Sequence, residues 1–310
     1  MRTLICGSLA FDSIMVFHDH FKHHILPDKI HILNVSFLVP DLRREYGGCA
    51  GNIAYNLKLL GGEPVIMATV GEDFAPYRER LNQLGLSEEC VRLVEGTYTA
   101  QAFITTDLSD NQITAFHPGA MNQSHLNDAG SARGIKLGIV SPDGREGMLA
   151  HCEQFDRANI PFVFDPGQGM PLFSGDELMQ MVRQADYVTL NDYEAELLQV
   201  RTGRTLKQLA REVRCLIVTR GGEGSRFHVE GKVLDIPVAP VREVVDPTGC
   251  GDAFRAGLLY GIVNGLDWET TGRLASLMGA MKIESRGGQN HAPSRMAIET
   301  RFAESFGYRF

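Results

Sequence analysis

The sequence predicts an α/β protein in which helices flank both faces of a mostly parallel central sheet, with a small inserted β-sheet as a lid. Two observations predict this fold class. Short apolar runs recur along the chain, and each is followed by turn residues and a helical pattern, as in buried parallel strands. Two stretches, of which one holds β-rich runs, interrupt this alternation and predict the inserted sheet. We expect one domain over residues 1–310, because no linker or repeat divides the chain.

Six apolar runs carry the prediction of the central sheet. They are rich in Leu, Ile, Val and Phe, which suits strands that are covered on both faces. The runs are residues 4–6, 65–69, 137–140, 162–164, 187–190 and 216–219. Near the end of the chain, residues 251–263 and 269–283 are rich in Ala, Gly and Leu with few charges, which predicts two helices packed against each other.

The lid is predicted from two stretches. Residues 16–39 are rich in His, Phe and Ile, and residues 97–116 hold two β-rich runs separated by the hairpin-like turn Asp107-Leu108-Ser109-Asp110-Asn111. We therefore expect the lid to be formed by segments of about 12–45 and 97–118. Because an exposed sheet edge can pair between subunits, we expect either a monomer or a lid-mediated homodimer.

The composition argues against several classes of protein. The chain has 30 basic and 38 acidic residues and a net charge of −8, which argues against a nucleic-acid-binding protein with a broad basic face. No apolar run approaches the roughly 20 residues that a membrane-spanning helix needs. The six cysteines form no Cys-x-x-Cys pair, which fits reduced thiols. We expect a cytoplasmic protein that binds a small molecule, with no nucleic-acid or membrane partner.

The segment Asp246-Pro247-Thr248-Gly249-Cys250-Gly251-Asp252 predicts the chemistry. Gly249 and Gly251 flank one residue where a loop becomes a helix, so backbone N–H groups there can face an anion. A carboxylate beside an anion repels it, which makes sense if the carboxylate accepts a proton. Asp252 is therefore expected to be the catalytic base in phosphoryl transfer, and Gly249, Cys250 and Gly251 the anion hole. The alternative is a glycine turn in which Asp252 only caps a helix.

This segment resembles the C-terminal signature of the PfkB, or ribokinase-like, family of carbohydrate and nucleoside kinases. Other motifs resemble the family in the same order, from near the first residue to about Gly288. They are Gly7-Ser8-Leu9-Ala10-Phe11-Asp12, Gly47-Gly48-Cys49-Ala50-Gly51-Asn52-Ile53-Ala54, Val70-Gly71-Glu72-Asp73, Asn191-Asp192-Tyr193-Glu194 and Thr219-Arg220-Gly221-Gly222-Glu223-Gly224. Cys250 departs from the family, in which Ala is common at that position. The resemblance implies a ribokinase-like fold and an ATP-dependent kinase, most similar to bacterial adenosine and nucleoside kinases.

The resemblance also implies which residues bind the acceptor. Asp12, Gly47, Gly48 and Asn52 match the family's acceptor-binding motifs. Asp12 would accept hydrogen bonds from two sugar hydroxyls, and the two glycines would let the sugar approach the backbone. For Asp12 alone, a carboxylate that caps a loop is the alternative.

A second set of residues is implied to bind ATP and its ions. These residues are Asn191, Glu194, Thr219, Gly221 and Gly224. Asn191 and Glu194 lie one helical turn apart, so that Glu194 could hold Mg²⁺ through water. The resemblance further implies a monovalent cation such as K⁺ near Asp246 and residues 286–288.

Aromatic residues in the lid favour a nucleoside as the acceptor, because a base needs apolar faces on which to rest. They are Phe17, Phe21, Phe37, Phe103 and Phe116, with Gln101 nearby. We therefore expect phosphorylation of the 5′-hydroxyl of a ribonucleoside, with adenosine as the first candidate. The alternatives are a ribokinase- or fructokinase-like enzyme that acts on a free sugar and a non-catalytic nucleoside or sugar sensor. A sugar phosphate would need a cationic anchor, for which only Arg43 and Arg44 are paired near these motifs.

Four histidines in the lid segment raise the question of a metal site. They are His18, His20, His23 and His24. Nothing nearby completes a tetrahedral set of ligands, so we expect a solvated loop there instead.

Overall fold

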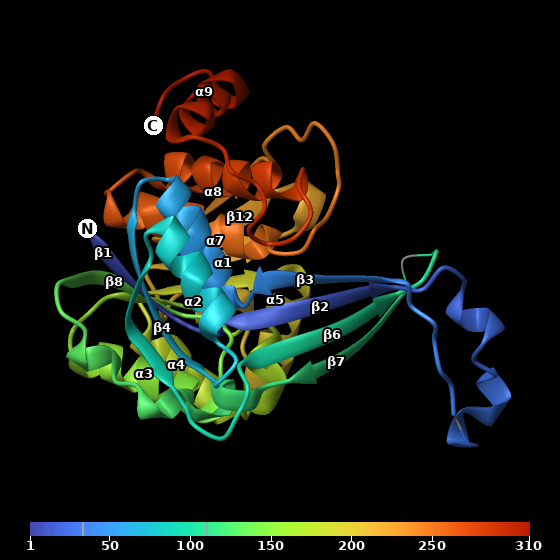
Figure 1. The fold of residues 1–310 in the computed structure, drawn as a ribbon. Helices are drawn as coiled ribbons and strands as arrows, with labels where there is room; N and C mark the ends of the chain where they lie inside the picture. Colours follow the sequence, from blue (N-terminus) through green and yellow to red (C-terminus); the bar gives the residue numbers. More distant parts are fainter. Residues whose placement is uncertain (33, 110) are drawn as a thin grey trace.

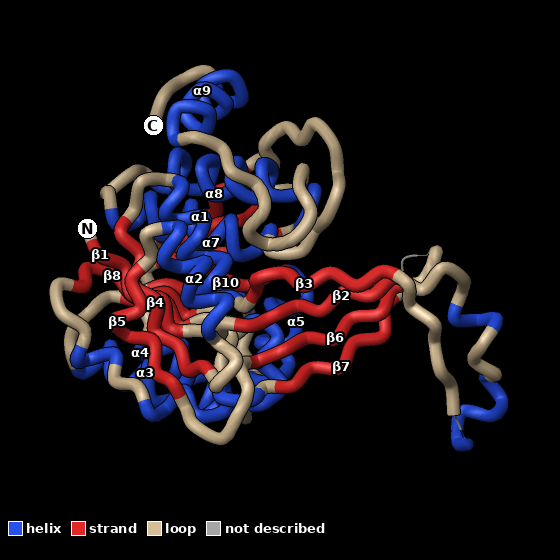
Figure 2. The backbone as a smooth tube through the Cα atoms, viewed as in Figure 1, coloured by secondary structure: helices blue, strands red, loops and turns tan. Residues whose placement is uncertain are grey.

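The structure is a computed structural model that describes residues 1–32, 34–109 and 111–310. A nine-stranded sheet forms the centre of the body, and a four-stranded sheet projects from it (Figures 1 and 2). This arrangement confirms the predicted fold class, a mostly parallel central sheet flanked by helices with a small separate sheet. Among the described residues, no helix is long and apolar enough to cross a membrane.

The large sheet has the strand order β13-β12-β11-β10-β9-β8-β1-β4-β5. Its strands pair in parallel from β5 to β11. At the other edge, β12 pairs antiparallel with β11, and β13 pairs antiparallel with β12. The strands are β1 (Arg2–Cys6), β4 (Glu63–Val70), β5 (Ser87–Leu93), β8 (Ile135–Val140), β9 (Phe162–Phe164), β10 (Tyr187–Asn191), β11 (Cys215–Thr219), β12 (Ser225–Val229) and β13 (Lys232–Ile236). All six predicted strands lie in this sheet.

Helices cover both faces of the large sheet because its strands are apolar on both sides. In β1, Ile5 packs into one layer, and Leu4 and Cys6 pack into the other, since successive side chains of a strand alternate. The first layer holds α1 (Cys49–Leu59), α2 (Ala75–Leu84), α7 (Cys250–Val263) and α8 (Trp268–Ile283). The second holds α3 (Arg145–Arg157), α4 (Gly175–Gln184), α5 (Asp192–Thr202) and α6 (Leu206–Leu209).

Two late helices and one terminal helix complete the body. The predicted contact between the late helices is present: a Cβ atom on Gly257 of α7 would lie 2.6 Å from the Cα of Ala275 in α8. The two backbones therefore approach more closely than larger side chains would allow. Helix α9 (Arg295–Phe306) packs Ile298 and Phe302 against the outer side of α8.

The lid sheet has the order β3-β2-β6-β7. Its strands are β2 (Ala10–Val16), β3 (Asp41–Gly47), β6 (Ala100–Thr106) and β7 (Gln112–His117). The two inner strands, β2 and β6, are parallel, and β3 and β7 are antiparallel to them. Strands β2 and β3 overlap the two ends of the segment expected at about 12–45, and β6 and β7 lie within that expected at about 97–118. All side chains of β7 are exposed at the outer edge.

The expectation of β structure within residues 16–39 is wrong for most of that stretch. Only Val16 lies in a strand, and the described residues after it form two short 3-10 helices, η1 (Phe21–His23) and η2 (Pro27–Ile32), and irregular chain beyond the tip of the lid (Figure 1). Phe17 and Phe21 are buried there, and the ring of Phe37 lies 4.9 Å and 5.0 Å from theirs. These aromatic residues form a small cluster of their own instead of a strand ladder.

The turn between β6 and β7 is organised by one carboxylate. Asp107 Oδ1 accepts hydrogen bonds from the backbone N–H groups of Ser109 at 2.8 Å and Asn111 at 3.0 Å. Its Oδ2 accepts one from the N–H of Phe21 at 3.0 Å, which fastens the turn to the segment after β2. Asp110, the remaining member of the predicted hairpin turn, lies outside the described residues.

Four further 3-10 helices lie in the connections of the body. They are η3 (Gly119–Leu126), η4 (Ala129–Ser131), η5 (Gly167–Leu172) and η6 (Gly221–Glu223). The last of these follows β11 directly and belongs to one of the predicted binding loops.

Candidate active site

The predicted anion-binding loop leads into the first turn of α7. Gly249 is the N-cap of this helix and has φ +76, a left-handed conformation that favours glycine. The N–H of Cys250 donates to the carbonyl of Pro247 at 3.1 Å. The amides of Gly249 and Gly251 on either side are therefore the better candidates for binding an anion, with the positive end of the helix dipole behind them.

Asp252 stands in the first turn of α7, beside these glycines. Its Oδ2 accepts a hydrogen bond of 2.9 Å from Nδ2 of Asn52, which belongs to the glycine motif near the N-terminus. Burial raises the pKa of Asp252 to about 7, although the hydrogen bond from Asn52 and the charge of Arg255 oppose the shift. The charge of Asp12 raises this pKa further, so the two carboxylates share one electrostatic environment. A carboxylate with a pKa near 7 suits a general base at neutral pH.

A buried hydrogen-bond chain holds Asn52 in this position. Oδ1 of Asn52 accepts a hydrogen bond of 3.2 Å from Nε2 of Gln289, which also donates to the hydroxyl of Tyr77 at 2.8 Å. The Tyr77 hydroxyl in turn donates to the carbonyl of Gly47 at 2.8 Å. Sequence reasoning missed Gln289 and Tyr77, because their polar groups meet only through contacts between distant segments.

Asp12 lies on β2, directly against the glycines at the end of β3. A Cβ atom on Gly47 would lie 2.4 Å from Oδ2 of Asp12, so the absence of a side chain makes room for the carboxylate itself. Gly48 has φ +86, and a Cβ atom there would lie 2.5 Å from the carbonyl oxygen of Ser8. Burial raises the pKa of Asp12 to about 6, and the charge of Glu45 on the facing strand adds to the shift.

Asn191 and Glu194 form a reciprocal cap at the start of α5. Oδ1 of Asn191 accepts a hydrogen bond from the N–H of Glu194, and Oε2 of Glu194 accepts one from the N–H of Asn191, both at 2.7 Å. Burial raises the pKa of Glu194, and the negative charge of Asp165 raises it further. Mg²⁺ is commonly held by one or two carboxylates together with phosphate oxygens and water, so Oε1 of Glu194 fits such an ion. The described residues contain no cluster of three or more acidic, histidine or cysteine ligands.

The predicted nucleotide loop lies beside this cap. Strands β10 and β11 pair in parallel with Asn191 opposite Thr219, so both motifs stand at the same carboxyl edge of the sheet, where open α/β sheets bind ligands. Gly221 and Gly224 follow with φ +51 and φ +85. A Cβ atom on Gly224 would lie 2.2 Å from the carbonyl oxygen of Ile236, so the loop requires glycine there.

A buried ion pair joins α7, the helix that carries Asp252, to the end of β9. It was not predicted from the sequence. Arg255 of α7 donates to both carboxylate oxygens of Asp165 at 2.8 Å and 2.9 Å, and both side chains are almost fully buried. The charges of Asp165, Glu194 and Asp252 raise the pKa of Arg255 against the opposing effect of its burial. Two sequence signals were available: Arg255 lies one turn after Asp252 on the same helix, and Asp165 directly follows a buried parallel strand.

Asp246 joins the anion-binding loop to the turn after α8. Its Oδ1 accepts a hydrogen bond from the N–H of Thr248 at 2.9 Å, and its Oδ2 accepts one from the N–H of Gly287 at 2.8 Å. The backbone hydrogen bonds lower the pKa of this carboxyl, although partial burial opposes them. Both oxygens of the predicted cation ligand are therefore already engaged by the protein.

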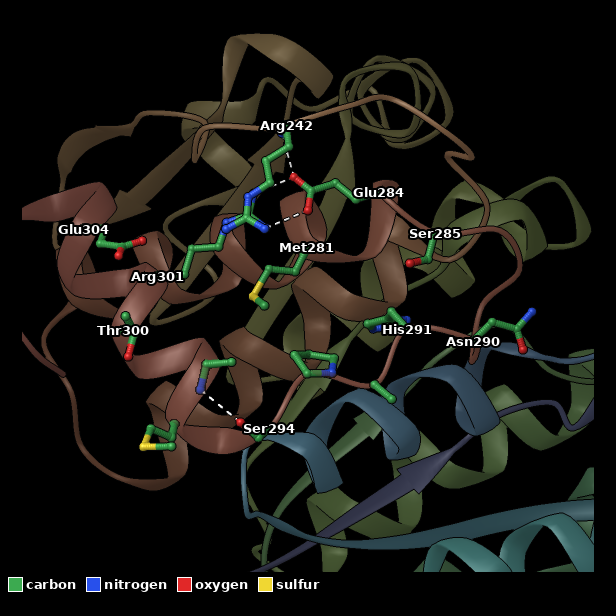
Figure 3. Close-up of a pocket in the computed structure, with 14 residues that line it drawn as sticks. Arg242, Met281, Glu284, Ser285, Asn290, His291, Ser294, Thr300, Arg301 and Glu304 are labelled. Atoms are coloured by element: carbon green, nitrogen blue, oxygen red, sulfur yellow. Dashed lines mark hydrogen bonds and ion pairs between the residues drawn. The ribbon is translucent and has the colours of Figure 1, made fainter.

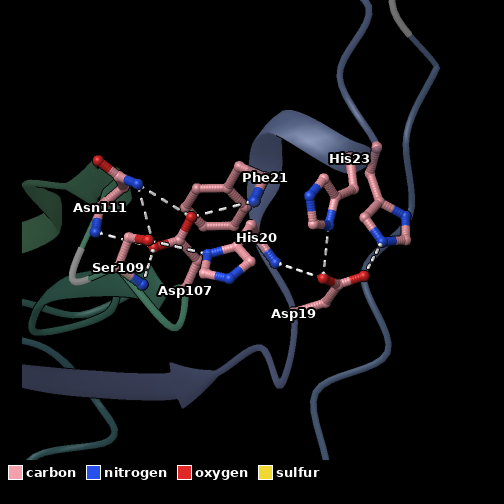
Figure 4. Close-up of polar contacts among 8 residues, drawn as sticks. Asp19, His20, Phe21, His23, Asp107, Ser109 and Asn111 are labelled. Atoms are coloured by element: carbon pink, nitrogen blue, oxygen red, sulfur yellow. Dashed lines mark hydrogen bonds and ion pairs between the residues drawn. The ribbon is translucent and has the colours of Figure 1, made fainter.

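The lid histidines contact acidic and hydroxyl groups of the loop (Figure 4). His23 and His24 hydrogen-bond the two carboxylate oxygens of Asp19 at 2.8 Å and 2.9 Å. Their hydrogen bonds, led by that of His24, lower the pKa of Asp19. His20 lies 2.9 Å from the hydroxyl of Ser109. His23 and His24 are exposed, as expected for a solvated loop, whereas His20 is partly buried.

A separate cavity of about 680 Å³ lies between α8, α9 and the turn that follows α8 (Figure 3). Its polar wall contains a salt bridge in which Arg301 contacts both oxygens of Glu284 at 2.6 Å and 2.7 Å. None of the predicted catalytic or acceptor residues lines this cavity. The candidate active site therefore rests on the polar contacts described above and lies outside this cavity.

Comparison with known proteins gives consistent matches along the chain. Residues 9–295 match the model of the pfkB family of carbohydrate kinases. The nucleoside kinase of Methanothermobacter thermautotrophicus is 31% identical over 96% of this chain and 97% of its own length. The nucleoside kinase of Methanocaldococcus jannaschii is 31% identical over 84% of this chain and 86% of its own.

The chain is also similar to solved structures of a nucleoside kinase. The nucleoside kinase of Burkholderia thailandensis in complex with inosine is 55% identical, covers 99% of both chains and has a TM-score of 0.91. The structure of the same kinase in complex with ADP-inosine is 56% identical, covers 99% of this chain and 97% of its own, and has a TM-score of 0.88.

Proposed function

The chain belongs to the pfkB family of carbohydrate kinases and is a kinase with a hydroxyl acceptor, and from this premise we propose that it phosphorylates the 5′-hydroxyl of a ribonucleoside. The observation that carries the proposal is the hydrogen bond between Asn52 and Asp252. It joins the acceptor motif to the carboxylate that stands beside the anion-binding loop. Base, acceptor and phosphoryl group can then meet at one point, as phosphoryl transfer requires.

In this proposal, Asp252 accepts the proton of the 5′-hydroxyl while the hydroxyl oxygen attacks the terminal phosphorus of ATP. The bond between that phosphorus and the bridging oxygen breaks, and ADP leaves. The amides of Gly249 and Gly251 donate hydrogen bonds to the phosphoryl oxygens, on which negative charge is spread during transfer. Arg255 lies one turn further along α7, where its positive charge favours the ionised form of Asp252.

ATP is proposed as the phosphate donor, with Mg²⁺ bound beside it. The ADP-inosine complex of the Burkholderia thailandensis kinase supports an adenine nucleotide in a protein of this fold. Asn191, Thr219, Gly221 and Gly224 would bind the nucleotide, and the carboxylate of Glu194 would hold Mg²⁺ through water. The ion would neutralise charge on the phosphates.

A nucleoside fits the acceptor side better than a sugar phosphate. Arg44 lies 3.7 Å from Asp73, and its guanidinium stands 3.7 Å from the ring centre of Phe11, while Arg43 lies 3.6 Å from Glu45. Both paired arginines are therefore engaged by carboxylates of the protein. The inosine complex of the 55% identical kinase supports a purine ribonucleoside. We propose adenosine and inosine as the first substrates to test.

The aromatic argument for a nucleoside needs a correction. Phe17, Phe21 and Phe37 pack on one another beyond the tip of the lid sheet, so they do not offer a free face to a base. Phe103 and Phe116 are exposed by 41% and 50% on the lid sheet, next to its outer edge. Together with the exposed side chains of β7, they support pairing of two lids in a homodimer.

The function is tested by incubating the purified protein with Mg-ATP and separate panels of nucleosides, free sugars and sugar phosphates. We expect ADP formation with purine ribonucleosides and little with the other two panels. Turnover of free sugars alone would replace the proposal with a ribokinase- or fructokinase-like activity.

Removal of the Asp12 carboxylate is expected to weaken nucleoside binding without a matching loss of turnover. If it accepts two sugar hydroxyls, Asp12→Ala should raise the KM for the nucleoside on the order of 100-fold, while kcat changes much less. Asp41→Ala is the matched control, since Asp41 is exposed at the far end of β3. Equal changes in kcat and kcat/KM would show instead that Asp12 interacts with the substrate only in the transition state.

The rate is expected to rise with pH. Asp252 must be ionised to accept a proton, and its pKa is raised to about 7 in the free protein. Below that pH, kcat/KM should therefore fall about tenfold for each pH unit. Asp12, with a pKa of about 6, should add to the loss at lower pH.

The expected fall in kcat/KM at low pH is not caused by unfolding of the protein when Asp252 becomes protonated. Folding raises the pKa of Asp252 from 3.8, so its contribution to stability is greatest below that value and is lost as the pH rises through about 7. Circular dichroism over the same range serves as the control. A value of kcat/KM that stays constant across neutral pH would argue against Asp252 as the base.

A further inference from the structure

Lys282, in the last turn of α8, has its charged group inside the protein. The residue is 0% exposed, which is rare for lysine. Its Nζ donates hydrogen bonds to the carbonyl oxygen of Asp246 at 2.7 Å and to that of Ser285 at 2.9 Å. The proposed reaction uses neither the lysine nor these two carbonyl groups.

A buried ammonium group is costly unless oxygen atoms replace its water. Here two carbonyl dipoles do so, and the carboxylate of Asp246 adds a negative charge nearby. Burial lowers the pKa of Lys282, but the negative charge of Asp246 opposes that shift. The two carbonyl dipoles favour the ammonium form of the lysine, and backbone oxygens of the same kind bind K⁺ in proteins.

The two carbonyl groups belong to the segments that shape the anion-binding loop. Asp246 lies three residues before Gly249, and Ser285 lies in the turn after α8, on the wall of the cavity in Figure 3. The same two segments are joined by the hydrogen bond from the N–H of Gly287 to Asp246 Oδ2. They are also joined by backbone hydrogen bonds from Val245 and Asp246 to the carbonyl of Ile283. The ammonium group thus lies where the loop before α7 meets the end of α8.

These contacts do not fit the monovalent cation that the family resemblance implies near Asp246. A bound K⁺ needs several free oxygen ligands, but the carbonyls of Asp246 and Ser285 already accept hydrogen bonds from Lys282. Both carboxylate oxygens of Asp246 are occupied by amides. A K⁺ ion at these carbonyls would lie beside a buried charge of the same sign, which would repel it.

We propose that the ammonium group of Lys282 takes the place of this monovalent cation and holds the anion-binding loop in its active shape. Lys282 is a positioning residue, because it acts through the backbone of Asp246. The consequence for catalysis rests on the proposed kinase reaction, whereas the consequence for ion binding does not. Turnover should therefore be independent of added K⁺.

The wild-type protein tests this directly. Turnover of Mg-ATP with inosine and the Tm without any substrate are measured in KCl and in tetramethylammonium chloride at equal ionic strength. We expect both quantities to be the same in the two salts. A wild-type protein that needs K⁺ for turnover, or that K⁺ stabilises beyond tetramethylammonium, would overturn the proposal.

Two variants extend the test. Lys282→Ala removes the ammonium and leaves space, so its turnover in tetramethylammonium should fall on the order of 100-fold through misplacement of the loop. K⁺ or NH₄⁺ should restore most of this loss and raise the Tm of the variant. Lys282→Met fills the space with an apolar chain, and we expect no rescue by either ion.

A lysine elsewhere provides the control. Lys58 is exposed and also donates to a backbone carbonyl, that of Gly85, at 3.1 Å. Lys58→Ala should respond to the two salts as the wild type does. If Lys282→Ala folds and K⁺ changes neither its turnover nor its Tm, the lysine has only a structural role and the proposal fails. If the variant does not fold, the wild-type measurements decide the question.

The two proposals can fail separately. A wild-type protein that phosphorylates no nucleoside would refute the proposed substrate. The Tm measurements would still show whether Lys282 excludes K⁺, because they use no substrate.

Discussion

Replacing Asp252 with asparagine is expected to lower kcat by about 10²–10⁴-fold, the usual contribution of a general base. Asparagine keeps the size of the side chain and can still accept the hydrogen bond from Asn52, so the site should keep its shape. What it loses is the ability to accept the proton of the attacking hydroxyl. Nucleoside binding, measured by isothermal titration calorimetry, should stay within a few-fold of the wild type, because the base acts mainly in the transition state.

The control for this substitution is the same change at a comparable position. Asp176 is an exposed aspartate in the first turn of α4, on the opposite face of the large sheet. Asp176→Asn should leave turnover unchanged. Unchanged turnover in Asp252→Asn would show that Asp252 is not the base. Loss of nucleoside binding would show that Asp252 contributes to binding of the substrate before the reaction.

Replacing Gly249 with alanine is expected to lower kcat by about 10²–10³-fold, the cost of losing one donor of an oxyanion-type hole. The Cβ atom would lie 3.1 Å from the Cα of Gly288, and the residue has φ +76. Alanine therefore has to move the loop or strain it, and either change displaces the amides from the phosphoryl group. Single-turnover kinetics with saturating ATP and nucleoside would measure the loss in the chemical step.

Gly265→Ala separates this effect from backbone strain. Gly265 follows α7 with φ +68 and has open space around its Cα, so alanine there carries a similar conformational cost far from the loop. Both variants should lose a similar amount of thermal stability from strain. Only Gly249→Ala should lose turnover, and equal kinetics in the two variants would contradict the anion-hole assignment.

The sequence alone was sufficient to predict six of the nine strands of the central sheet, but not β5, β12 and β13. Parallel strands covered on both faces are short apolar runs, and this local signal located all six predicted strands. The motif at Gly249 was equally local, because glycine at the start of a helix permits the left-handed conformation that Gly249 adopts. These features depend on neighbours in the chain and therefore appear in its sequence.

Features that depend on distant contacts were not predictable in the same way. Asp165 and Arg255 lie 90 residues apart and form a buried pair, and the sequence does not show which charges are buried together. Lys282 was missed for the same reason: its ammonium group reaches a carbonyl 36 residues earlier in the chain. The aromatic residues of the lid were placed in the right segment, but their mutual packing at its tip was not anticipated.

The glycines of the acceptor motif show a subtler limit. They were expected to admit the sugar, whereas a Cβ atom on Gly47 would meet the carboxylate of Asp12. A glycine in a motif thus indicates close approach of some group, and the structure is needed to identify that group.

The most direct test of the central claim is the position of the phosphate in the product. Wild-type protein is incubated with Mg-ATP and inosine, and the product is examined by proton-coupled ³¹P NMR. If Asp252 and the Gly249–Gly251 bend act on the 5′-hydroxyl, the phosphorus should couple to the two protons on C5′. Phosphate on the 2′- or 3′-oxygen, or release of inorganic phosphate without a phosphorylated nucleoside, would contradict the account.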